Sequence, residues 1–545
     1  MKEARGVHEV EETKEESKEE KKQEVGRCSS NSFSSSLLPC LLASLLLLLS
    51  ACSRGPSAEP GSITFLIETM PANLDPRIGT DAQSQFLDSL IFSGLLERDA
   101  QMNLRGDLAE RWDTPDPLTY VFHLRRGVRF HDGRPLTSAD VKFTFDSILS
   151  GAIKTPKRGS FRELAAVEAP DVETVIFHLR EPYASFPWNL VRPAVGVVPA
   201  GSGSDFAHHP VGTGPFRFVS ARQDEDVVLE RNPDYFHGVA SVARVRFRIV
   251  PEATVRALEL RKGTADLVLN SLTPDMVPVL ARQPQLKVAE QPGTIYSYVA
   301  YNFDDAVLAH RDVRQALAYA TDRADLVKYL LRGQARVADG LLPPNHWAYE
   351  PDVQHYGYDP ARAEQLLDAA GFPRRDAPGG GGMRLKLTLK TSTEELPRLL
   401  GAVLQEQWRR VGVELELRSL EFATLYADIT RGNFQLYTLR WVGANNDPDI
   451  FEYVFHSRKT PPDGANRGHY RNPRLDALLD QARVEPDREK RRRTYGEVQR
   501  IVAVDQPYLD LWFYDNVCVH RQRVTHVELT PTGNYDFVAG LLVQQ

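Results

Sequence analysis

The strongest constraint on this fold is that its 545 residues contain only four cysteines, three of which precede residue 53. Cys518 is the one cysteine in the rest of the chain, so no internal disulfide can stabilise that part. A chain of this length exceeds what one hydrophobic core can organise. We therefore predict two or more domains that are held together by buried apolar surface. Hydrophobic residues make up 42% of the chain and charged residues 26%, which is typical of a folded globular protein and not of disorder.

The N-terminus predicts export. An apolar run of thirteen residues, 37–49, is too short for a membrane-spanning helix, and the small residues Ser50 and Ala51 follow it. This order is typical of a secretory signal peptide, and residues 49–52 resemble the lipobox of bacterial lipoproteins, in which the cysteine is lipidated. We predict a signal segment over residues 1–51, a lipidated Cys52 that begins a polar tether over 52–61, and a periplasmic or cell-surface location at the membrane. The acidic run before the apolar segment is atypical of a signal peptide and indicates an over-extended N-terminus.

Charge argues against nucleic acid as a partner. The formal net charge is −7, which leaves no basic surplus to neutralise phosphates.

Strands and helices are mixed along the chain without a repeat of fixed period. Alternating apolar residues predict strands, and apolar residues at helical spacing predict helices, the clearest of which covers 395–411. Ser138 or Thr137 is expected to cap a helix over 139–149. This order of elements predicts α/β lobes with mixed sheets. The expected strands are 63–67, 120–124, 227–230, 245–250, 385–389, 413–417 and 435–440, and the other expected helices are 254–262, 312–320, 323–331 and 360–370.

A family resemblance is carried by residues 112–141, which combine a strand, a glycine-containing turn and a capped helix. This segment resembles the signature of the family 5 extracellular solute-binding proteins, which include dipeptide, oligopeptide and nickel binders. Shorter matches follow the order of the family along the chain, at residues 71–76, 210–216, 231–236, 312–317 and 441–449.

The resemblance implies a two-lobed periplasmic-binding-protein fold of type II, in the large cluster that has an extra subdomain in lobe I. Lobe I would comprise residues 62–300 and 519–545, with the subdomain inserted at about 97–214, and lobe II residues 301–518. Two strands would cross between the lobes, near Val299–Phe303 and Phe513–Val519.

The resemblance also implies a function and partners. The protein would be the extracytoplasmic substrate-binding component of an ABC importer, which closes around a peptide or another small solute and delivers it to a permease and its ATPase. It would act as a monomer, anchored to the membrane through its lipid, without a cofactor and without a metal site.

Ala444 departs from the peptide binders of the family, which have an aspartate three positions after the loop tryptophan, here Trp441. Without that carboxylate a free-amino dipeptide would bury an uncompensated ammonium, so this ligand is disfavoured. Asp447 either substitutes for the carboxylate or forms a turn, and Thr391 falls where a dipeptide binder has the arginine that holds the ligand carboxylate. Longer or N-blocked peptides, neutral or anionic small molecules and metal chelates remain open.

The residues that the resemblance places at the ligand are partly ambiguous. Tyr301 and Tyr514 either stack on the ligand or pack the hinge, and Arg440 either binds an anion or forms a surface ion pair. The full set of expected ligand-binding residues is Glu68, Thr69, Tyr301, Arg440, Trp441, Gly443, Ala444, Asn445, Asp447 and Tyr514.

No catalytic motif supports an enzyme. Residues 201–204 have the wrong spacing for a nucleophile elbow, and the sequence has no zinc-protease motif, phosphate loop or cysteine cluster. His131 lies inside the packing segment, which predicts a structural histidine. Two alternatives remain open: a sensor or adhesin that binds a solute without a transporter, and a surface hydrolase whose site is assembled from distant residues.

Overall fold

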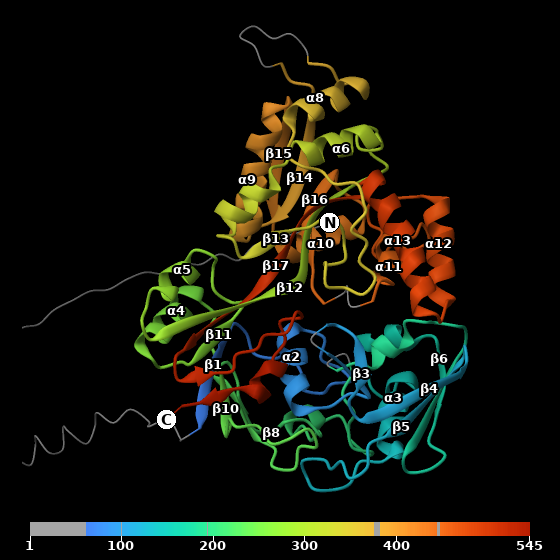
Figure 1. Ribbon diagram of the computed structural model, residues 1–545, viewed down its shortest axis with the longest axis vertical. Coiled ribbons are helices and arrows are strands. Elements are labelled where there is room, and N and C mark those ends of the chain that lie inside the picture. Colours follow the sequence, from blue (N-terminus) through green and yellow to red (C-terminus); the bar gives the residue numbers. More distant parts are fainter. Residues whose placement is uncertain (1–60, 100, 193–194, 375–381, 444–446, 545) are drawn as a thin grey trace, which may run out of the picture. The chain divides into compact units, whose positions relative to one another are not determined.

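The structure is a computed structural model that describes residues 61–99, 101–192, 195–374, 382–443 and 447–544. It has a two-lobed mixed α/β fold, as predicted. One sheet of eleven strands passes through both lobes in the order β15-β14-β16-β12-β17-β11-β1-β10-β9-β8, with β13 paired to β17 (Figure 1). A separate four-stranded sheet has the order β4-β5-β7-β6.

The first lobe is built from both ends of the described chain. Its main core contains Phe65, Phe247 and Cys518, and β1 pairs in parallel with β10. Its elements are β1 (Ser62–Ile67), α2 (Ala82–Ile91), β8 (Phe216–Arg222), β9 (Asp226–Arg231), β10 (Arg244–Ile249), α4 (Ala253–Lys262), β11 (Leu267–Leu269), α5 (Met276–Ala281), β18 (Val524–Thr525), η5 (Asp536–Gly540) and β19 (Leu542–Val543).

The segment between α2 and β8 has a core of its own around Phe122, Phe145 and Phe177. Thr137 is the N-cap of α3, and its backbone N–H donates to the carboxylate of Asp140 at 2.9 Å. This hydrogen bond satisfies a backbone N–H that has no partner within the helix. The elements are β2 (Leu96–Arg98), β3 (Leu104–Gly106), β4 (Ala109–Asp116), β5 (Thr119–Leu124), α3 (Ser138–Leu149), η1 (Pro156–Phe161), β6 (Leu164–Glu168), β7 (Thr174–Leu179), η2 (Phe186–Leu190) and η3 (Phe206–His208).

His131 has the structural role that its position predicts. The backbone N–H of Gly212 donates to its Nδ1 at 3.2 Å, so Nε2 carries the proton and donates to the carbonyl of Gly214 at 3.1 Å. Burial lowers the pKa of His131 to about 4, so the ring is neutral and links two turns.

The second lobe has two cores, one around Trp408 and Trp512 and the other around Tyr298 and Tyr437. Helix α9 begins where it was predicted and buries Leu400, Leu404 and Trp408 at helical spacing. The elements are β12 (Leu286–Tyr301), α6 (Arg311–Tyr319), α7 (Arg323–Asp325), the π-helical η4 (Leu326–Leu330), β13 (Ala335–Val337), α8 (Pro360–Ala369), β14 (Leu385–Ser392), α9 (Glu395–Arg410), β15 (Val413–Leu420), α10 (Phe422–Thr430), β16 (Leu436–Trp441), α11 (Ile450–Phe455), α12 (Pro473–Val484), α13 (Arg488–Asp505) and β17 (Tyr508–Arg521).

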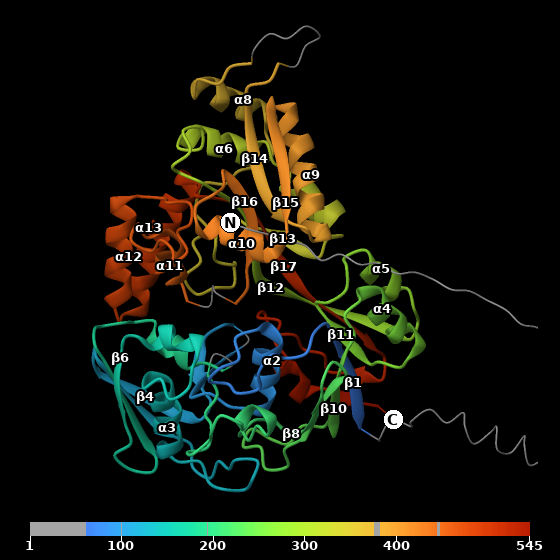
Figure 2. The same ribbon diagram turned by 180° about the vertical axis from the view of Figure 1, so that it is seen from behind.

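The long strands β12 and β17 connect the lobes (Figure 2). They pair antiparallel along their length, but between the pairs Pro292–Asp515 and Tyr296–Phe513 strand β12 has three residues where β17 has one. Gly293 lies in this irregular stretch, where a Cβ atom would collide with the carbonyl oxygen of Tyr514. Two strands thus connect the lobes, as predicted. On β17 the irregular stretch falls within the expected Phe513–Val519, but on β12 it lies before the expected Val299–Phe303, which enters the core of the second lobe. The predicted lobe boundaries fall within or next to these two strands and stay a prediction.

No helix among the described residues combines the length and apolar character that crossing a membrane requires.

Candidate ligand-binding site

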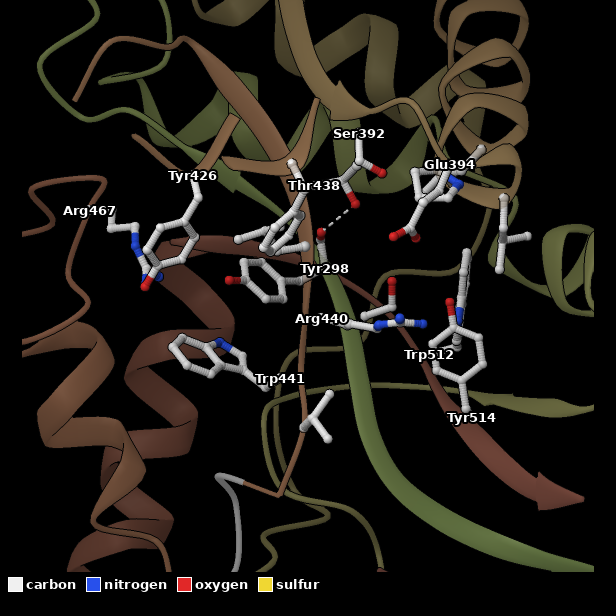
Figure 3. A pocket seen from close by; sticks show the side chains of 17 residues that line it. Tyr298, Ser392, Glu394, Tyr426, Thr438, Arg440, Trp441, Arg467, Trp512 and Tyr514 are labelled. Carbon is white, nitrogen blue, oxygen red and sulfur yellow. Dashed lines mark hydrogen bonds between the residues drawn. The ribbon is translucent and has the colours of Figure 1, made fainter. Parts of the chain in front are cut away.

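A cavity of about 390 Å³ lies at the carboxyl ends of β14 and β16, two parallel strands of the main sheet. Ligands of α/β proteins commonly bind at this edge of a sheet. The helices α9 and α10 both start beside the cavity (Figure 3). The lining residues are Ser297, Tyr298, Ser392, Glu394, Leu396, Pro397, Leu400, Phe422, Tyr426, Thr438, Leu439, Arg440, Trp441, Val442, Arg467, Trp512 and Tyr514.

Aromatic rings form much of the wall. Tyr298 stacks on Tyr508 behind it, with ring centroids 4.1 Å apart, and on Trp441 at 6.2 Å. Phe422 and Tyr426 stack along α10 at 6.1 Å and are about half exposed, at 53% and 43%. Such rings offer a ligand apolar contact at little cost in conformational entropy.

Arg467 carries a buried positive charge at one end of the cavity. Only 6% of the residue is exposed, and its guanidinium lies 5.2 Å from the centroid of the Tyr426 ring and 5.7 Å from that of Trp441. Its Nη2 donates to the hydroxyl of Tyr426 at 3.0 Å. Its Nε and Nη1, and the indole Nε1 of Trp441, have no well-aligned hydrogen-bond acceptor among the residues that the structure describes, although the phenol of Tyr437 lies beside the guanidinium. Buried donors without acceptors are costly, so this end of the cavity is built to receive an acceptor.

Arg440 and Glu394 bring two further charges to the cavity (Figure 3). Within the described ranges, neither side chain forms a hydrogen bond or an ion pair with another residue. Arg440 and Tyr514 also line a neighbouring cavity of about 170 Å³, so they lie between the two spaces. Burial raises the pKa of the Tyr514 phenol, which therefore remains a neutral hydroxyl.

Comparison with known proteins identifies the family. Residues 103–461 match the family described as "Bacterial extracellular solute-binding proteins, family 5 Middle". The chain belongs to this family. The predicted function, a substrate-binding component of an importer, is confirmed at the level of the family, whose members are binding proteins. The comparison does not identify the ligand.

Relatives of this family 5 protein bind chemically diverse ligands. "Heme-binding protein A" of Haemophilus influenzae is 28% identical, over 92% of this chain and 98% of its own length. The oligopeptide-binding protein AppA of Bacillus subtilis, solved with a nonapeptide, is 25% identical with a TM-score of 0.72, over 89% of this chain and 99% of its own. NikZ of Campylobacter jejuni, solved with Ni(L-His), is 26% identical with a TM-score of 0.73, over 89% of this chain and 100% of its own.

The structure of this solute-binding protein brings three of the predicted site residues, Arg440, Trp441 and Tyr514, into the 390 Å³ cavity. Gly443 and Asp447 line a different space, of about 820 Å³, together with residues of the 156–189 region. The predicted residues Ala444 and Asn445 lie outside the described residues.

Three other predicted residues lie away from the cavity. Tyr301 is buried in the core of the second lobe and is 1% exposed. Glu68 forms an ion pair with Arg256 at 3.3 Å, and Thr69 beside it is exposed. Thr391, at the position compared with the carboxylate-binding arginine of dipeptide binders, is fully buried, and its neighbour Ser392 lines the cavity instead.

Asp447 is engaged by protein groups. Its carboxylate forms an ion pair with Arg491 at 2.8 Å and accepts a hydrogen bond from the hydroxyl of Ser185 at 2.7 Å. Arg491 donates to Ser185 as well, at 2.8 Å. Next to this cluster, Tyr183 donates to Asp449 at 2.9 Å, and burial raises the pKa of Asp449 to about 7. The carboxylate of Asp447 thus has its counter-charge within the protein.

Arg467, Glu394 and the ring pair of α10 line the cavity without having been expected there from the sequence. Arg467 lies in an irregular segment between α11 and α12. No local feature of the sequence distinguishes it from the exposed Arg458 in the same segment. The one available signal for Glu394 is its position directly before the amphipathic α9, at the end of a strand.

Proposed function

We propose that this protein captures a small anionic solute in the 390 Å³ cavity and delivers it to an ABC permease and its ATPase. The single observation that carries this proposal is the unpaired hydrogen-bonding capacity of Arg467, a buried cation aimed into an aromatic cavity. A carboxylate or phosphate would satisfy it with charge-assisted hydrogen bonds.

The other charges refine the ligand. Arg440 and Arg467 contribute two positive charges and Glu394 one negative charge, so the cavity carries a net charge of +1. The solute would place its anionic group between the arginines, its apolar body against Trp441 and Tyr426, and a donor group toward Glu394. The volume of the cavity, about 390 Å³, is at the low end of the roughly 300–1,000 Å³ typical of small-molecule sites. This size favours a compact solute over a long peptide. A free-amino dipeptide remains disfavoured because Ala444 replaces the aspartate that pairs with the ammonium in the family's peptide binders, which leaves Glu394 as the one carboxylate among the described lining residues.

Purification without a denaturing step tests this proposal. We expect a compound with a carboxylate or phosphate to co-purify and to be identified by mass spectrometry, and the ligand-free protein to bind it again in calorimetric titration. Ala-Ala tests the departure at position 444, since its carboxylate suits the arginines but its ammonium could pair only with Glu394. It should bind far more weakly, and tight binding would show that Glu394 replaces the missing aspartate. A co-purifying ligand without an anionic group, or tight binding of Ala-Ala, would contradict the proposal.

We also propose export with a lipid anchor on Cys52. The support is the order of the sequence: a short apolar run, small residues, the cysteine and then a polar tether. The variant Cys52→Ala should move the protein from the membrane fraction into the soluble extract, which fractionation and immunoblotting measure. Cys40→Ala, inside the segment that export removes, is the control and should leave the protein at the membrane. If Cys52→Ala stays in the membrane fraction as well, the anchor lies elsewhere.

A further inference from the structure

Two buried carboxylates converge on an imidazole in the first lobe, outside the ligand cavity. Glu97 lies in β2, Asp107 directly follows β3, and His237 belongs to the loop between β9 and β10. Glu97 is 6% exposed and Asp107 is not exposed at all, whereas the His237 side chain is one third exposed, at 33%. One oxygen of each carboxylate and the Nε2 of His237 lie within 4.8 Å of one another.

Each carboxylate accepts a hydrogen bond at one oxygen, whereas its other oxygen has only ion-pair neighbours. Arg192 donates to Oε2 of Glu97 at 3.1 Å, and the backbone N–H of Gly94 donates to Oδ2 of Asp107 at 3.1 Å. Oε1 of Glu97 and Oδ1 of Asp107 accept no hydrogen bond from the described residues, although Arg105 Nε lies 3.1 Å from the former. A wholly buried carboxylate oxygen without a donor requires an explanation. Metal ligands have this arrangement, because outer-shell hydrogen bonds orient each carboxylate and leave one oxygen for the ion.

The two distances from the imidazole suit a tetrahedral ion. His237 Nε2 lies 3.3 Å from Oδ1 of Asp107 and 3.6 Å from Oε1 of Glu97. Zinc bound at about 2.0–2.1 Å in a tetrahedral site holds its ligand atoms roughly 3.3 Å apart. The imidazole also packs beside the Phe236 ring, with the two centroids 4.4 Å apart.

The charges around Glu97 and Asp107 are compatible with a bound cation. Both carboxylates are buried and lie beside the same imidazole, so their like charges repel each other. Arg192 compensates both carboxylates, at 3.1 Å from Oε2 of Glu97 and 3.9 Å from Oδ2 of Asp107, and leaves Oε1 and Oδ1 on the side of His237. The side chain of Arg105 is 60% exposed, so it can turn away from Oε1 into water at little cost.

We propose that Glu97, Asp107 and His237 form a binding site for a divalent cation of the zinc class, with solvent at the fourth position. One imidazole and two carboxylates suit zinc better than calcium, which prefers six or more oxygen ligands. The ion would fasten the β2–β3 hairpin to the loop after β9 and stabilise the first lobe.

Calorimetry of the purified protein, without a histidine tag and after treatment with a chelator, tests the site. Titration with ZnCl₂ at neutral pH should give one equivalent of saturable binding, and CoCl₂ should give a visible spectrum of tetrahedral Co²⁺. Zinc should also raise the melting temperature in a concentration-dependent way. Each of His237→Gln and Asp107→Asn should lower zinc affinity at least about tenfold, since losing even an outer-shell partner costs that much.

His209→Gln is the matched control, because His209 is an exposed histidine of the same lobe, and it should leave stoichiometry and affinity unchanged. If Asp107→Asn does not fold, His237→Gln alone tests the site, because the side chain of His237 is partly exposed. Absence of saturable zinc binding by the wild type would overturn the site and leave His237 as a polar neighbour of the two carboxylates. Equal binding by wild type and His237→Gln would overturn it too.

Discussion

The variant Arg467→Met is expected to bind the anionic ligand about 30-fold or more weakly than the wild type, because truncating one partner of a buried charge pair costs roughly 2–5 kcal/mol. Methionine keeps much of the apolar stem that packs on Tyr426 and Trp441 but removes the charge and the hydrogen-bond donors. Calorimetric titration of the co-purified compound into ligand-free protein measures the loss. Arg467→Lys should fall between the two, since it keeps the charge but not the planar fork of donors.

Arg458→Met is the control for this result. Arg458 lies nine residues earlier in the same irregular segment, but 73% of its side chain is exposed and it pairs with Asp480 at the surface. Its loss should change affinity little. If Arg467→Met binds the ligand as tightly as the wild type while remaining folded by circular dichroism, the anion is bound elsewhere.

The second large effect concerns stability. Asp447→Ala should lower the free energy of unfolding of the surrounding region by about 3–5 kcal/mol, because it leaves Arg491 buried without its counter-charge. The two side chains are 7% and 6% exposed. Ser185→Ala removes only the hydroxyl and should cost about 1 kcal/mol. Urea unfolding followed by tryptophan fluorescence gives both losses relative to the wild type.

A double variant makes this test specific. Adding Arg491→Met to Asp447→Ala removes the stranded charge and should recover part of the lost stability. Ligand affinity should fall far less in Asp447→Ala than in Arg467→Met, since Asp447 does not line the ligand cavity. The opposite pattern, normal stability with lost affinity, would mean that Asp447 acts on the ligand directly.

The sequence predicted those elements whose signal is local. Helix α9 follows from the spacing of Leu400, Leu404 and Trp408, and β5 from strict alternation. By contrast, α13 was missed because it begins with a run of arginine and lysine that resembles a solvated segment. Its Arg491 is buried only because Asp447, 44 residues away, provides the counter-charge, and no local pattern contains that information.

The residues of the candidate site also fall into two groups, those that the sequence predicts and those that it does not. Arg440, Trp441 and Tyr514 follow from the resemblance to the family, because they stand at recognisable positions on strands. Arg467 could not be distinguished from other arginines, since its burial depends on rings from α10 and β16 that meet only in the fold. On β12, pairing shifts between Ser297 and Tyr298, and both line the cavity although strict alternation would place them on opposite faces.

All residues that line the ligand cavity fall between positions 297 and 514, on the side of the molecule that contributes β12 to β17. The groups that would recognise a solute are therefore assembled before the other lobe takes part. Binding and release of the solute would then depend on different parts of the molecule. The association rate would depend on the preformed surface of the second lobe, whereas the residence time would depend on how firmly the first lobe covers the bound solute. Changes in the first lobe should then alter how long a solute stays and not which solute is chosen.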